Sequence, residues 1–115
     1  MRDEERTPET MPTAAPSQAE IDQWKARHGE VYAFESDELV AYCRKPGRAD
    51  IARFSKEVQR DLYRASWNLL VACLLHPSVE VLQQHADRRP GIVVSLAGEL
   101  TDVAGVTLPF SSRKL

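Results

Sequence analysis

Residues Trp67 to Leu75 read WNLLVACLL, in which Asn68 is the single strongly polar residue. A helix that is apolar on nearly every side is buried on nearly every side, so we expect this segment at the centre of the core. The sequence before it continues a helical pattern, with apolar residues three or four positions apart: Ile51, Phe54, Val58, Leu62, Ala65, Leu69 and Ala72. The pattern predicts helix over residues 49–75, as one long helix or as two joined by a bend near residues 56–60.

Two further helices are expected after this segment. His76-Pro77 ends the long helical pattern, because proline cannot continue a helix. Ser78 is a suitable N-cap for a helix from Val79 to about Asp87. Pro90 stands in the first turn of another helix, which runs from Gly91 to about Val103. Its apolar stripe comprises Ile92, Val93, Leu96, Ala97, Leu100 and Val103.

A short helix and a β-hairpin precede the long helical segment. Ser17 and Glu20 have the spacing of a capping box at the start of a helix from Gln18 to His28. Residues 30–35 (EVYAFE) and 38–44 (ELVAYCR) are rich in β-branched and aromatic side chains. This composition favours two strands, joined by a turn at Ser36-Asp37.

The hairpin is expected to be apolar on both faces. If Phe34 lies opposite Leu39, alternation divides the side chains between two faces. One face carries Tyr32, Phe34, Leu39, Ala41 and Cys43, and the other carries Val31, Ala33, Val40 and Tyr42. One face can then pack on helices while the other meets a partner. The turn contains neither Asn-Gly nor Asp-Gly, so it does not fix the register.

These elements predict a single α+β domain over residues 17–106, with one β-hairpin packed against four or five helices. Residues 1–16 contain three prolines and almost no large apolar side chains. Such a segment cannot bury enough surface to offset the entropy of ordering it, so a disordered N-terminal tail is expected. Residues 107–115 are expected to form a frayed C-terminus.

The composition indicates a soluble, intracellular protein. The 115 residues carry 15 basic and 17 acidic side chains, a net charge of −2, which excludes a strongly basic nucleic-acid coat. No apolar run approaches the roughly 18 residues that span a bilayer, and the charged start lacks the apolar part of a secretory signal. The two cysteines, Cys43 and Cys73, fit reduced thiols better than a disulfide scaffold.

No group of residues predicts an enzyme, a metal site or a cofactor. Cys73 and His76 are three apart, but zinc needs three or four ligands and no others show ligand spacing. Ser95 lacks the preceding glycine of a nucleophile elbow. Asp37 and Glu38 lie in a turn and are expected to be solvated. We therefore predict no catalytic residues, no metal and no cofactor.

Residues 44–64 form the one basic region, with seven basic and three acidic side chains and a local charge of +4. Arg53, Lys56, Arg60 and Arg64 are three or four apart, which would place them on one face of a helix. Such a face could track nucleic-acid phosphates. A solvated helix face, partly neutralised by neighbouring carboxylates, is the simpler interpretation and makes nucleic acid an unlikely partner.

Four short motifs in this order give the chain a family resemblance: WKARHGEVY at residues 24–32, YCRKP at 42–46, ACLLHPS at 72–78 and PGIVVSLAGEL at 90–100. The sequence resembles the small proteins of bacteriophage and prophage tail modules described as tail assembly chaperones. The resemblance spans about residues 20–106. It implies a non-enzymatic role in the cytoplasm of a bacterial host: covering the long helical tape-measure protein until the tail tube has polymerised around it.

The resemblance suggests where a protein partner would bind. A helper with an apolar groove and a charged rim can cover the apolar stripe of a long helix. Candidate partner-binding residues are Val31, Val40, Tyr42, Arg44, Lys45 and Arg48, with the last helix either completing the groove or belonging to the core. Two other classes stay open: a small DNA-binding regulator that uses residues 44–64, and a self-associating structural protein whose hairpins pair in a homo-oligomer.

Overall fold

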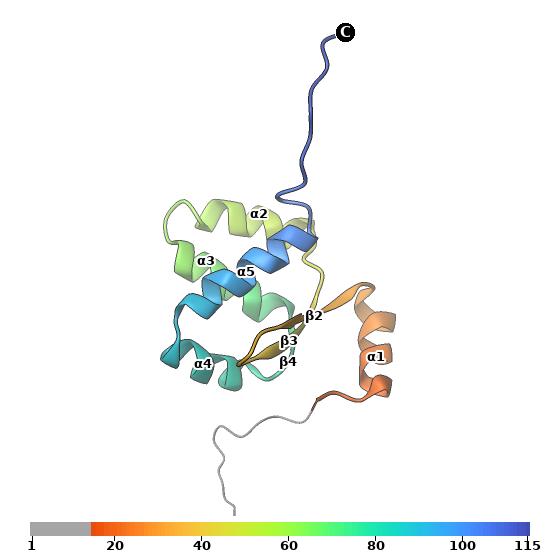
Figure 1. Ribbon diagram of the computed structural model, residues 1–115, viewed down its shortest axis with the longest axis vertical. Helices are drawn as coiled ribbons and strands as arrows, with labels where there is room; N and C mark the ends of the chain where they lie inside the picture. The colour runs from red at the N-terminus through yellow and green to blue at the C-terminus, as the bar shows by residue number, and fades with distance from the viewer. Residues whose placement is uncertain (1–14) are drawn as a thin grey trace, which may run out of the picture.

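A computed structural model describes residues 15–115, so most of the predicted N-terminal tail lies outside the described residues. The described part has an α+β fold, which confirms the predicted class (Figure 1). Its elements are α1 (Gln18–His28), β2 (Val31–Glu35), β3 (Val40–Arg44), α2 (Arg48–Glu57), α3 (Leu62–Cys73), β4 (Leu74–His76), α4 (Val79–Arg88) and α5 (Gly91–Val103). None of these helices has the length and apolar character needed to cross a membrane.

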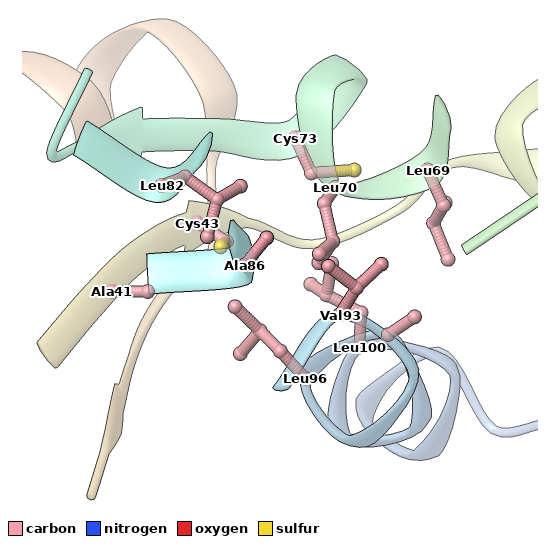
Figure 2. Close-up of a cluster of buried hydrophobic side chains, with 11 residues drawn as sticks. Ala41, Cys43, Leu69, Leu70, Cys73, Leu82, Ala86, Val93, Leu96 and Leu100 are labelled. Atoms are coloured by element: carbon pink, nitrogen blue, oxygen red, sulfur yellow. The ribbon is translucent and has the colours of Figure 1, made fainter. Parts of the chain in front are cut away.

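The core forms where α3, α4 and α5 meet the sheet. Leu69, Leu70 and Cys73 of α3 point toward α5 and the sheet, and all three are at most 1% exposed (Figure 2). They meet Ala41, Cys43, Leu82, Ala86, Val93, Leu96, Ala97 and Leu100. The apolar segment of residues 67–75 does supply the centre of the core, as predicted, because α3 packs on both α2 and α5.

This segment is neither wholly helical nor wholly buried, which corrects the prediction of a helix buried on nearly every side. The α3 helix ends at Cys73, and Leu74 has extended backbone angles of −67° and 129°. Leu74 to His76 form β4, which pairs with the edge of β3 that would otherwise be open. Trp67 is half-buried and Val71 is 38% exposed, so one side of α3 faces solvent.

The predicted helical segment 49–75 contains two helices. The first, α2, ends at Glu57, and a turn over residues 58–60 leads to α3. Asp61 caps α3, since its side-chain oxygen accepts a hydrogen bond from the Arg64 N–H at 3.0 Å. An aspartate that satisfies a free N–H at this position favours a new helix start over continuation of the old one.

The sheet has the order β2-β3-β4 and is antiparallel. Phe34 pairs with Ala41 and not with Leu39, so the register differs from the expected one by two residues. The turn is longer than predicted: the Ser36 N–H donates to the Leu39 carbonyl at 2.9 Å. A shift of two residues leaves every side chain on its predicted face, whereas a shift of one would exchange the faces.

The first helix contacts the face of the sheet that points away from the core through Trp24. Its capping box is present, with the Glu20 N–H donating to the Ser17 side chain and the Ser17 N–H donating to Glu20. The Trp24 and Tyr42 rings lie 6.0 Å apart. No residue of α1 is fully buried, and Figure 1 shows α1 standing apart from the other four helices. Trp24 therefore anchors α1 to the sheet and not to the helical core.

Candidate functional site

A groove runs between the core-facing side of the hairpin and the first half of α5. Its volume is about 670 Å³, within the range of roughly 300–1,000 Å³ typical of ligand sites. The apolar lining includes Phe34, Leu39, Ala41, Ile92 and Leu96. Ala41 and Leu96 are buried at its base, while Phe34, Leu39 and Ile92 are only partly covered. The groove therefore offers apolar surface that the fold itself does not fill.

The rim of this groove is charged. Arg89, in the turn between α4 and α5, forms an ion pair with Glu38 in the hairpin turn. This pair links the two walls at one end. Glu99 of α5 adds an exposed carboxylate. An apolar base with a charged rim is the usual anatomy of a small protein–protein contact.

The structure does not bring the predicted partner-binding residues together with α5. Val31, Val40 and Tyr42 lie on the opposite face of the sheet from the groove, as the register requires. Val93, Leu96 and Leu100 of α5 belong to the core. The sheet thus separates these hairpin residues from α5. In the predicted apolar stripe of α5, Ile92 lines the groove and stays partly exposed.

Val40 and Tyr42 line a second, more polar hollow of about 580 Å³. It lies between the hairpin and α4 and also contains His76, His85 and Arg88. The Tyr42 and His76 rings meet edge to face with centres 6.0 Å apart. Burial lowers the pKa of His85, with Arg88 adding to the effect. Ala15 and Pro16 already lie against this hollow, so it is a less open surface than the groove.

Arg44 forms hydrogen bonds that hold parts of the fold together. Its Nη1 donates to Asp50 Oδ2 at 2.9 Å, and its Nη2 donates to the Ala72 carbonyl at 3.0 Å. One side chain therefore joins β3 to the start of α2 and the end of α3. The Arg44 hydrogen bond holds the pKa of Asp50 below its usual value. Lys45 lies 3.3 Å from Glu30, and Arg48 is exposed at the first turn of α2.

We expect Asp50→Asn to lower the free energy of unfolding by about 1–3 kcal/mol, because it leaves the half-buried Arg44 guanidinium without its anion. The stability from a carboxylate with a depressed pKa is present above its unfolded pKa of roughly 3.9 and is lost as pH falls through the folded value. In denaturant melts, the parent should therefore lose this contribution to its free energy of unfolding below about pH 4. Asp50→Asn lacks the carboxylate and should show no such loss from this site. Asp37→Asn, in the exposed turn, is the control and should leave stability unchanged.

The two cysteines are buried thiols. Burial raises the pKa of Cys43 to about 12 and that of Cys73 to about 11. Neither sulfur is a thiolate near neutral pH, which is the form that reacts with disulfides and metals. Within residues 15–115, no three histidine, cysteine, aspartate or glutamate side chains gather as metal ligands would.

These thiols give a direct check of the core. A disulfide reagent such as DTNB should label neither cysteine in the native protein at pH 7–8 and both in strong denaturant. Rapid labelling of one thiol in the native state would show that the junction of β3 with α3 opens, contrary to the packing described above.

The basic region 44–64 does not form one continuous helix face. Because α2 ends at Glu57 and α3 begins at Leu62, Arg64 lies on a different helix from Arg53 and Lys56. Arg53 also lies 3.8 Å from Asp50. The predicted row of four basic side chains on one helix is therefore wrong, and the charges are spread over two helices and a turn.

The fold and the groove define a small α+β domain with an unfilled apolar surface. The chain belongs to the family described as a domain of unknown function, DUF6848, which matches residues 24–113. Among solved structures, it is similar to the uncharacterised protein rbstp2171 from Bacillus stearothermophilus, with 32% identity and a TM-score of 0.68. That match covers 81% of this chain and 99% of the other. Among curated proteins, none matches the chain.

Proposed function

We propose that this protein is a non-enzymatic chaperone of phage or prophage tail assembly that holds a helical segment of the tape-measure protein in the groove between the hairpin and α5. The observation that carries the proposal is the groove itself: partly exposed apolar side chains line it and charged side chains stand around it. The resemblance of the four sequence motifs to tail-module proteins supplies the identity of the partner.

An amphipathic helix suits this groove better than a small molecule does. Its apolar side chains recur at positions i, i+3, i+4 and i+7, so two or three of them can enter one shallow groove while the rest of the helix stays solvated. Each fully buried side chain contributes roughly 1.5–3 kcal/mol. After the costs of ordering and association, a dissociation constant on the order of micromolar is expected. Binding of this strength can be reversed when the tail tube replaces the chaperone.

The proposal predicts that a long helical tape-measure protein is encoded next to this gene, and peptides from that protein test it. The full chain is titrated with overlapping peptides of that protein, and binding is followed by calorimetry and by the gain of helical circular dichroism. We expect at least one peptide with an amphipathic helical pattern to bind and to gain helix. Failure of every peptide to bind, or a gene remote from any long helical open reading frame, would count against the proposal.

A further inference from the structure

The C-terminal tail, residues 106–115, carries four exposed large apolar side chains, the last of them at the terminal Leu115. Val106, Leu108 and Phe110 are 54%, 60% and 89% exposed. Val106 lies in the turn that ends α5, whereas Leu108 and Phe110 flank Pro109, so an extended chain places these two on one side. A row of exposed large apolar side chains marks an interaction surface. The family match extends through this tail to residue 113, so the tail is part of the shared domain.

The end of α5 sets the direction in which the tail leaves. The Val106 N–H donates to the Thr101 carbonyl at 3.0 Å, and the Gly105 N–H donates to the Asp102 carbonyl at 2.9 Å. This is a Schellman motif, and Gly105 supplies its positive φ of 92°. Figure 1 shows the tail running away from the body of the fold. The groove involves the other end of α5, from Gly91 to Glu99, so the tail leads away from the groove of its own chain.

We propose that the tail of one copy docks in the groove of a second copy, which makes the protein a tail-exchanged homodimer. The groove and the tail match in shape and polarity, because the partly exposed Phe34, Leu39 and Ile92 can pack against the apolar side chains of the tail. The groove also borders β2, an outer strand of the sheet, and outer strands accept an added extended segment. Pro109 lacks an N–H but is tolerated in a strand at a sheet edge.

The charges of tail and groove are complementary. Arg113 and Lys114 follow Phe110 in the tail. Glu99 of α5 stands on the groove rim, and within residues 15–115 it forms no salt bridge. A docked tail would bring its two cations toward this carboxylate. This complementarity favours the tail of a second copy over an unrelated apolar segment as the occupant.

The exchange goes beyond the proposed function, although it uses the same groove. In the dimer, the tail covers the apolar base until a helical partner displaces it. The dimer can therefore be tested without any tape-measure peptide, and either proposal can fail while the other stands.

The test is sedimentation of the full chain across a concentration series. The parent is compared with Phe110→Ser in the tail, Ile92→Ser in the groove, and Leu62→Ser as a control. Leu62 is 48% exposed and begins α3, outside the groove. Circular dichroism checks that each variant is folded. We expect a concentration-dependent dimer for the parent and Leu62→Ser, with dimer dissociation constants raised about 10- to 100-fold in the other two.

A second arm identifies the contact. A labelled peptide of residues 104–115 should bind full-length Phe110→Ser, and binding should be lost when Ile92→Ser is added to that chain. A parent that stays monomeric at every concentration would overturn the proposal. So would a dimer that persists unchanged in Phe110→Ser, since its interface would then lie elsewhere.

Discussion

Replacing Leu70 with alanine is expected to destabilise the fold by about 2–5 kcal/mol, the range for removing a large apolar side chain from a packed core. Leu70 is fully buried, and in Figure 2 its side chain points from α3 toward Val93 of α5. Its neighbours come from separate elements, so they cannot close the cavity by moving as one. A small domain has a total stability of roughly 5–15 kcal/mol, so this single change removes a large part of it.

Equilibrium denaturation in urea measures the effect, with Val71→Ala as the matched control on the same helix. Val71 is 38% exposed, and its truncation should cost well under half as much as that of Leu70. Equal losses from the two variants would mean that α3 does not present the described face to the core.

Ile92→Asp is expected to abolish binding of the helical partner, with a loss of about 100-fold or more in affinity. The change removes apolar surface from the groove and places a carboxylate where apolar side chains of the partner would lie, and an unpaired charge is costly to bury. The fold should tolerate it, because Ile92 is only partly buried and stands in the first turn of α5. An acidic side chain near a helix N-terminus interacts favourably with the helix dipole.

Val40→Asp is the matched control for this prediction. Val40 is also β-branched and is 40% exposed, but it lies on the face of the sheet opposite the groove. Affinity for the same peptide, measured by calorimetry, should fall for Ile92→Asp and stay near the parent value for Val40→Asp. The reverse result would place the partner on the Val31, Val40 and Tyr42 face, where the sequence alone suggested it.

Local signals in the sequence were sufficient for much of this fold. The capping box at Ser17 and Glu20, the cap at Ser78 and the alternation in the hairpin act through neighbouring residues, so they can be recognised without tertiary information. The division of the hairpin into two faces was correct for the same reason, even though its register was shifted by two residues.

The features that the sequence did not predict depend on tertiary contacts. Leu74 to His76 leave the helix because the edge of β3 is available for pairing, and an apolar run of this kind is equally compatible with helix. The role of Arg44 depends on Asp50 and on the distant Ala72 carbonyl. The groove exists because α5 covers only part of the hairpin face that carries Phe34 and Leu39. Alternation identifies that face but does not tell how much of it a helix covers.

Chemical-shift mapping of the isotope-labelled full chain with the bound tape-measure peptide tests the central claim most directly. The account predicts that the largest amide shifts occur along both walls of the groove, at Phe34, Leu39, Ile92, Ser95 and Glu99. Shifts concentrated at Val40, Tyr42 and His76, or along the basic residues 48–64, with the groove unchanged, would contradict it.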